Sequence, residues 1–238
     1  MQAGAMARFA NRLLHAAFPT LCVFCGANHR NGPVCGPCRA VLPRIKLICE
    51  HCGQPLAATQ PEGVVCAACQ AKPPQYYKAR APFTYDFPID SALKALKFKR
   101  QLWYVPALAE LLLPVLEQEF SACDALVPVP LHRTRHALRG FNQATELCRP
   151  LRRATGLPIL RQVYRHIATR SQAGLSAAER NKNVRNAFGI KGHVSCRYPL
   201  IIDDVITTGA TCAQLAITLL HAGAKKVGVL TVARVQPG

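Results

Sequence analysis

The sequence predicts an α/β protein in which a small cysteine-rich module precedes a parallel-sheet domain. Two observations lead to this prediction. Near the C-terminus, apolar runs at 199–202 and 227–232 flank a helical stretch at 211–221, which is the order of two parallel strands joined by a helix. Near the N-terminus, eight of the 12 cysteines gather within residues 22–69. The 238 residues are enough for one sizeable α/β core and a small accessory module.

We expect three segments along the chain: a short amphipathic helix at 1–19, the cysteine-rich module at 20–72 and the α/β domain at 76–238. The basic helix packs on the protein itself or lies on a membrane surface, and we favour the first arrangement. Lys72-Pro73-Pro74 has the composition of a linker between the other two segments. No transmembrane segment is expected, because no apolar stretch reaches the length of a membrane span, and no signal-peptide pattern precedes the module.

The eight clustered cysteines form four C-x-x-C pairs. Disulfides are improbable without a secretion signal, and a redox pair would need a βαβ context that is missing here. The pairs therefore predict two structural Cys₄ zinc sites, whose metals supply folding energy to a module with little apolar core. Sequential pairing gives the sites Cys22, Cys25, Cys35 and Cys38, and Cys49, Cys52, Cys66 and Cys69. Interleaved pairing is the alternative that the spacing leaves open.

Local patterns predict the other elements in chain order: a strand at 76–85, a helix at 89–96, a strand at 125–127 and a helix at 141–149. The second strand must end at Pro128, where a shaped loop begins, and Pro150 ends or kinks the second helix. The polar and basic segment 166–187 is expected to form a mobile flap that closes over an anion site. Its candidate residues are Gln172, Arg180 and Asn183.

Positive charge is concentrated in the second half of the chain. The net charge is +18, and residues 121–198 alone hold 14 basic and 3 acidic residues. A pyrophosphate site needs only a few cations, so this excess favours a polyanion such as single-stranded DNA as a partner. Lys94, Lys97 and Lys99 either contact nucleic acid or form a solvated helix face.

The most informative pattern is the run from Leu200 to Thr211. An apolar strand leads to Asp203 and Asp204, and a Thr-Thr-Gly-Ala-Thr turn then opens a helix. Open α/β sheets bind ligands at the carboxyl ends of their strands, and such a turn offers backbone N–H groups and hydroxyls to an anion. The adjacent carboxylates are costly unless hydroxyls or a cation meet them. The run therefore predicts a site for a phosphorylated sugar, and the missing Gly-Lys-Ser/Thr excludes a Walker A loop.

This run resembles the phosphoribosyl-pyrophosphate signature of type I phosphoribosyltransferases. The resemblance implies that the parallel-sheet domain is type I phosphoribosyltransferase-like. It also implies that Asp203 and Asp204 hold the ribose hydroxyls of phosphoribosyl pyrophosphate, with Mg²⁺ accompanying the ligand. The residues implied for the 5′-phosphate are Thr207, Thr208, Gly209, Ala210 and Thr211. Arg133, Arg135 and Arg139 suit either the pyrophosphate or the backbone of a nucleic acid.

Two further stretches narrow the resemblance. Pro128-Val129-Pro130-Leu131-His132-Arg133 and Arg139-Gly140-Phe141-Asn142-Gln143, together with the double zinc ribbon, resemble the ComF/GntX family. One departure is Lys94, where we would expect histidine. The resemblance implies a cytoplasmic protein at the inner face of the inner membrane. There it would work with competence or inner-membrane proteins and handle incoming single-stranded DNA, in natural transformation or in the use of DNA as a nutrient.

Three functions follow as hypotheses. The first is a DNA-handling factor whose pocket binds phosphoribosyl pyrophosphate or a nucleotide phosphate. The second is an active phosphoribosyltransferase, which transfers phosphoribose in a Mg²⁺-dependent reaction to an acceptor that the sequence does not identify. The third is an interaction adaptor in which the zinc ribbons are the only functional part. The intact Asp-Asp and Thr-Gly-Thr elements favour ligand binding, which the first two hypotheses share.

Overall fold

A computed structural model describes residues 20–30, 32–166 and 186–236 of the protein. The elements in chain order are β1 (Thr20–Leu21), β2 (Asn28–His29), α2 (Gly36–Ala40), α3 (Ala67–Ala71), β3 (Lys78–Arg80), β4 (Phe83–Thr84), α4 (Ile89–Lys99), α5 (Tyr104–Glu119), β5 (Ala125–Pro128), α6 (Arg133–Arg139), α7 (Gln143–Thr155), β6 (Val163–Arg165), β7 (Phe188–Ile190), β8 (Pro199–Ile206), α9 (Ala210–His221) and β9 (Gly228–Arg234). The expected helix at 1–19 and the flap residues Gln172, Arg180 and Asn183 lie outside the described residues.

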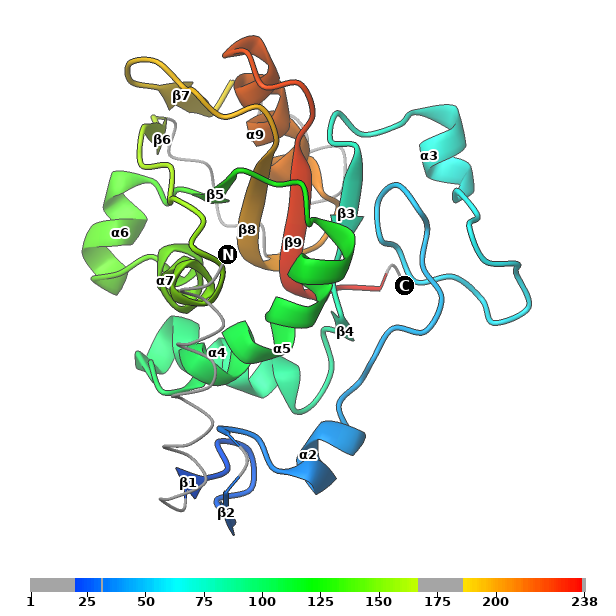
Figure 1. The fold of residues 1–238 in the computed structure, drawn as a ribbon, viewed down its shortest axis with the longest axis vertical. Helices are drawn as coiled ribbons and strands as arrows, with labels where there is room; N and C mark the ends of the chain where they lie inside the picture. Colours follow the sequence, from blue (N-terminus) through cyan, green and yellow to red (C-terminus); the bar gives the residue numbers. More distant parts are fainter. Residues whose placement is uncertain (1–19, 31, 167–185, 237–238) are drawn as a thin grey trace.

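A five-stranded sheet forms the centre of the molecule (Figure 1). Its order is β3-β9-β8-β5, and the short β4 pairs with β9 beyond the end of β3. All of these pairings are parallel. Every residue of β9 is buried, and strands that are covered on both faces have continuous apolar runs. This finding confirms the α/β fold with a parallel sheet.

Helices cover both faces of the sheet. On one face, α4, α5 and α7 pack against Leu200 and Ile202 of β8. On the other face, α9 packs against Ile201 of the same strand and Val229 of β9. Successive side chains of a strand normally point to opposite faces, but Val205 packs with Leu200 and Ile202, whereas Ile206 packs with Ile201. The alternation of β8 is therefore interrupted between Ile202 and Val205.

Several elements differ from the sequence expectations. The expected strand at 76–85 is divided into β3 and β4, because Pro82 lies between them and has no N–H to donate. The helix expected at 141–149 runs instead from Gln143 to Thr155, straight through Pro150. Its buried face, which includes Leu147 and Leu151, outweighs the loss of one backbone hydrogen bond at the proline. Helices α5 and α6 were not expected at all.

A small antiparallel hairpin of β6 and β7 stands beside the sheet. It joins the main domain through a bridge between His132 and Arg165, so the hairpin borders the loop that follows β5. Figure 1 shows this hairpin and α6 on one side of the sheet, whereas α3 of the cysteine-rich module lies on the other. Within the part of the chain that the structure describes, no helix is both long enough and apolar enough to cross a bilayer.

Candidate functional site

The cysteine-rich module brings its eight cysteines together in two groups of four. In each group the four sulfur atoms lie within 4.8 Å of one another. The groups are Cys22, Cys25, Cys35 and Cys38, and Cys49, Cys52, Cys66 and Cys69, which is the sequential pairing. The sulfurs of Cys25 and Cys35 are 3.7 Å apart. Such a separation suits tetrahedral ligands that each lie about 2.3 Å from one zinc ion.

Backbone N–H groups favour the thiolate form in both groups. The N–H of Cys35 points to the sulfur of Cys22 at 3.5 Å, and that of Cys66 points to the sulfur of Cys49 at 3.3 Å. Burial opposes the ionisation of Cys22, but these and neighbouring N–H groups outweigh it and lower its pKa to about 6. The same balance lowers the pKa of Cys49 to about 7. Burial and the neighbouring sulfurs instead raise the pKa of Cys38 and Cys69, so these thiols would lose their protons only on binding the metal. The convergence of four sulfurs in each group is what fits it to a structural zinc ion.

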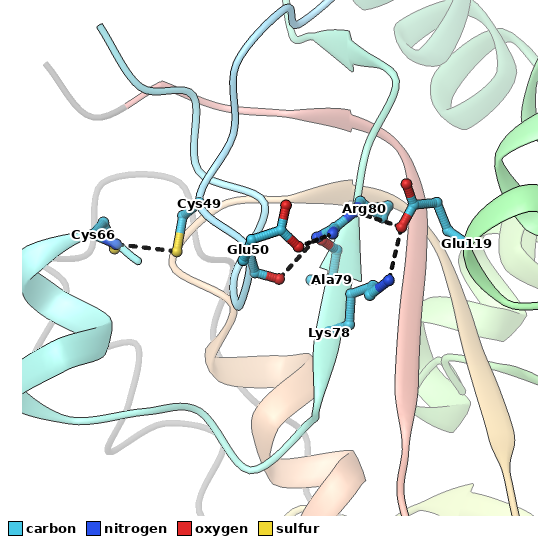
Figure 2. A network of polar contacts seen from close by, with 7 residues as sticks. All are labelled: Cys49, Glu50, Cys66, Lys78, Ala79, Arg80 and Glu119. Carbon is cyan, nitrogen blue, oxygen red and sulfur yellow. Dashed lines mark hydrogen bonds and ion pairs between the residues drawn. The ribbon is translucent and has the colours of Figure 1, made fainter. Parts of the chain in front are cut away.

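The second cysteine group is fixed to the edge of the sheet by Arg80 (Figure 2). This buried arginine contacts the Glu50 carboxylate at 2.5 Å and the Glu119 carboxylate at 3.1 Å. Lys78 adds a second contact to Glu119, at 2.8 Å. Glu50 lies in the zinc module, Lys78 and Arg80 belong to β3, and Glu119 ends α5. The network therefore joins the module, the sheet edge and one covering helix.

Backbone contacts complete this junction. The N–H of Ala79 in β3 donates to the carbonyl of His51 at 2.8 Å, which covers the free edge of the sheet. A Cβ at Gly53 would lie 2.6 Å from the Ala79 carbonyl oxygen, so only glycine allows this close approach. Arg234 of β9 donates to the carbonyl of Cys52 at 2.8 Å. The second cysteine group is thus part of the folded core.

The two predicted carboxylates lie within β8 rather than after it. We expected the strand to end near residue 202, but it continues to Ile206, because Val205 and Ile206 still pair with β9. Asp204 faces Lys97 of α4 and Gln143 of α7. The side chain of Asp203 interacts with that of Asp204, so the two carboxyl groups lie together at the end of the strand.

Asp204 is the centre of a polar network. Its side chain is almost fully buried, at 3% exposure, and it forms an ion pair with Lys97 of α4. Gln143, the first residue of α7, donates to its carboxylate at 3.3 Å and accepts from Arg139 at 2.6 Å. The sequence singled out Arg139 and Asp204 but gave Gln143 no role.

Lys97 does not lie on a solvated helix face, and only 20% of its side chain is exposed. The sequence held a signal for this position. Lys97 follows the buried Leu93 by four residues, so the two share one side of the helix. Lys94, by contrast, is exposed and pairs with Asp90 at 2.7 Å on its own helix.

The surroundings shift the pKa values of the two carboxyl groups in opposite directions. Burial raises the pKa of Asp203 well above its usual value, and the neighbouring Asp204 charge adds to this rise. Burial also opposes the ionisation of Asp204, but the Lys97 ammonium outweighs it and lowers the pKa of Asp204. The Oδ1 atom of Asp203 accepts the Asp204 N–H at 2.9 Å, and no described cation forms an ion pair with it. Asp203 is therefore the acid that a ligand could best compensate.

The loop after the carboxylates turns directly into α9. Gly209 has φ = 78° and precedes the first helical residue, and a Cβ there would lie 2.9 Å from the Tyr76 hydroxyl. Thr208 is exposed, and its hydroxyl accepts from the Ala210 N–H at 3.4 Å. The residues expected to hold a phosphate, Thr207 to Thr211, thus surround the positive end of a helix. The sequence analysis did not predict this contact between Tyr76 and the turn.

The three candidate arginines lie on one short helix, α6, but face different surroundings. Arg139 turns towards Gln143, as described above, whereas Arg133 lines an open pocket of about 570 Å³. Arg135 lies between them in sequence. Helix α6 is capped at its N-terminus by His132, whose ring accepts from the Thr134 N–H, and at its C-terminus by Gly140 in the left-handed conformation. The helix thus connects the surroundings of the carboxylates with those of the pocket.

Comparison with known proteins identifies a zinc-ribbon family model and several relatives that match most of the chain. A family model described as a double zinc ribbon domain matches residues 13–70. DNA utilization protein YhgH of Salmonella typhimurium is 38% identical over 208 residues, which cover 84% of this chain and 90% of the relative. YhgH of Escherichia coli K12 is 35% identical over 224 residues, covering 91% and 97%. Competence protein F of Haemophilus influenzae is 30% identical over 230 residues, covering 93% of each chain.

Proposed function

The chain belongs to the ComF/GntX family of DNA utilization and competence proteins, and from this premise we propose that it handles incoming single-stranded DNA. The names of its relatives support a role in DNA uptake, either in natural transformation or in the use of DNA as a nutrient. The charge of the chain supports direct contact with the strand, because +18 attracts a polyanion. We place this action in the cytoplasm, at the inner face of the inner membrane and beside competence or inner-membrane proteins, as the family resemblance implies.

We further propose that the carboxyl end of β8 binds phosphoribosyl pyrophosphate or a nucleotide phosphate. One observation carries this proposal. Asp203, which is half-buried and forms no ion pair with a described cation, stands four residues before a threonine-rich turn that leads into α9. Ribose hydroxyls would meet the carboxylate, and the helix N-terminus would meet the 5′-phosphate. Carboxylate oxygens also suit Mg²⁺, which would enter with the ligand and neutralise its phosphates.

The network around Asp204 favours positioning as the task of the second acid. Lys97 and Gln143 hold its carboxylate in place, so Asp204 is already compensated before any ligand arrives. We infer that Asp203 contacts the ligand, whereas Asp204 fixes the end of β8 and orients Gln143 and Arg139. This assignment divides two roles that the sequence gave jointly to both acids.

An active phosphoribosyltransferase is the alternative function. Arg139 supports it, because its guanidinium reaches the Asp204 network through Gln143, and a guanidinium fork matches the oxygens of a departing pyrophosphate. In such a transfer the bond from C1 of the ribose to pyrophosphate breaks while the acceptor bonds to C1. The chain's own contribution is positioning and charge stabilisation.

Calorimetric titration with phosphoribosyl pyrophosphate and Mg²⁺ tests the pocket. Asp203→Asn should weaken binding at least about tenfold, because the uncharged side chain loses charge-assisted contacts to hydroxyls or metal. Glu62→Gln is the matched control, since Glu62 is an exposed acid in the zinc module and its removal should change nothing. Equal affinity of wild type and Asp203→Asn would exclude the site. Release of pyrophosphate with a base or a nucleic-acid acceptor would establish the alternative.

A further inference from the structure

We propose that the pocket beside α6 binds a nucleotide of a single DNA strand, with Tyr164 stacking on the base and the surrounding cations contacting phosphates. This inference rests on the proposed function, to which it adds the contact surface. It draws on the size and charge of the pocket, the position of Tyr164, and the link from the pocket to the carboxylate site through the neighbouring residues Asn142 and Gln143.

The pocket is strongly basic. It has a volume of about 570 Å³ and lies among the loop before α6, the start of α7 and the hairpin of β6 and β7. Its cationic or protonatable wall residues are His132, Arg133, His136, Arg165, His166 and Lys191, and no acidic residue belongs to the described wall. Arg133 and Lys191 are exposed and therefore available to phosphate oxygens. The positive charge of the described wall favours an anion that carries more than one phosphate.

Tyr164 supplies an aromatic surface on the wall of this pocket. The residue is 38% exposed, although neighbouring residues contact its ring from more than one side. Gly189 pairs with it across the hairpin, and a Cβ at Gly189 would lie 2.7 Å from the Tyr164 ring. The Lys191 ammonium lies 5.5 Å from the ring centroid. A ring that is both fixed and accessible is suited to stacking on a base.

The dimensions favour a single strand over a duplex. A pocket of about 570 Å³ lies within the range of small-ligand sites, roughly 300–1,000 Å³, and so accommodates individual nucleotides. Bases in a duplex are stacked on one another and do not offer their faces to a side chain. Bases of a single strand do, and stacking on an aromatic ring tolerates any base. The expected ligand is therefore a flexible strand that binds with little sequence preference.

The pocket also adjoins the carboxylate site. Asn142 lines the pocket, and its neighbour Gln143 binds Asp204. The side chain of Asn142 is fixed at both ends, since it donates to the Val129 carbonyl at 2.9 Å and accepts from the Ala144 N–H at 3.0 Å. A strand in the pocket would therefore lie next to a phosphoribosyl ligand at the end of β8.

Fluorescence anisotropy with a labelled oligothymidylate of 15 nucleotides tests this inference. Tyr164→Ala should weaken binding by about 5- to 100-fold, the loss expected for one stacked base, while Tyr164→Phe should retain affinity. An abasic strand of equal length should bind both proteins alike. Lys191→Gln should reduce the salt slope by roughly one unit. Lys225→Gln is the matched charge control, because Lys225 is exposed and does not line the pocket.

The outcomes separate this inference from the proposed function. If the wild-type protein binds no strand at low salt, the proposed role of direct DNA handling fails, and the inference fails with it. If it binds the strand, but Tyr164→Ala and Lys191→Gln behave like the Lys225→Gln control, only the pocket is overturned. An equal loss for abasic and base-carrying strands would also overturn it, because stacking would then not be the cause. Preference for free thymidine monophosphate over the strand would identify a nucleotide pocket and contradict the strand assignment.

Discussion

Replacing Asp204 by asparagine should destabilise the protein, whereas the same replacement at Asp203 should not. Asp204 is 3% exposed and paired with Lys97, whose side chain is 20% exposed. Removing one member of a buried ion pair costs about 3–5 kcal/mol. The partial exposure of Lys97 and the amide that still accepts from Gln143 reduce this loss to about 2–3 kcal/mol. For a chain of this length the melting temperature should fall by roughly 4–12 °C.

The pH dependence of each variant follows from the direction of its pKa shift. The pKa of Asp204 is lowered by Lys97, so its contribution is present above the unfolded pKa and is lost as pH falls through the folded pKa. The pKa of Asp203 is raised by burial, so its protonated form is the stabilised one, and stability is lost as pH rises through the folded pKa. Asp203→Asn should therefore raise the melting temperature at neutral pH, while Asp204→Asn should lower it.

Differential scanning calorimetry of the two variants, with Lys97→Met and the Lys97→Met/Asp204→Asn double variant, completes the experiment. The double variant should lose less stability than the sum of the two single variants, by about 1–3 kcal/mol, because either single change leaves a buried charge without its partner. Strict additivity, or a melting temperature of Asp204→Asn equal to that of wild type, would refute the reasoning. Equal destabilisation by Asp203→Asn and Asp204→Asn would refute the division of roles.

The remaining predictions concern the metal module, its junction with the sheet and the cell. Metal analysis should find about two zinc ions per chain and about one in Cys22→Ser; wild-type protein that stays folded without metal would contradict this. Arg80→Met should cost about 1–3 kcal/mol in a denaturant titration, because it leaves Glu50 and Glu119 without the buried guanidinium that joins them; an unchanged midpoint would argue against the junction. In a host that takes up DNA, deletion of the gene should block use of the DNA at a cytoplasmic step while DNA still crosses the outer membrane, and normal use would count against the proposed role.

The sheet was predictable because its strands are buried on both faces. Continuous apolar runs such as Ile201-Ile202 and Val229-Leu230 predict such strands even when the elements that pack on them are unknown. The spacing of the cysteines was equally informative, because metal ligands must converge over a short stretch of chain. Sequential grouping, however, became visible only when the sulfur positions were known.

The two missed helices differ in the signal that their sequences carry. Helix α6 has no buried residue, so its seven positions show no apolar face, and it depends on the cap at His132 and the turn at Gly140. Helix α5 contains Pro114 yet continues through it, because its buried leucines pack against the sheet. Helix α6 is thus decided by its end caps, whereas the apolar spacing of α5 is helical and was obscured by Pro114.

The candidate site was likewise predictable only where its residues are adjacent in sequence. Asp203, Asp204 and the threonine turn are adjacent in sequence, so one motif identifies them. The partners of Asp204 come from elsewhere: Lys97 is 107 residues away and Gln143 is 61 residues away. The position of Tyr164 over Gly189 likewise depends on pairing between two distant strands. Such contacts are set by topology, which a local motif does not contain.

Binding of single-stranded DNA to the wild-type protein over a range of salt concentrations tests the central claim most directly. If three to five cations contact phosphates, the logarithm of the affinity should fall linearly with the logarithm of salt concentration. The slope should lie between about −2 and −3.5, at about −0.7 per contact for a single strand. Binding should also change little with base sequence. Undetectable binding at low salt, or an affinity that does not respond to salt, would contradict direct handling of the strand by this protein.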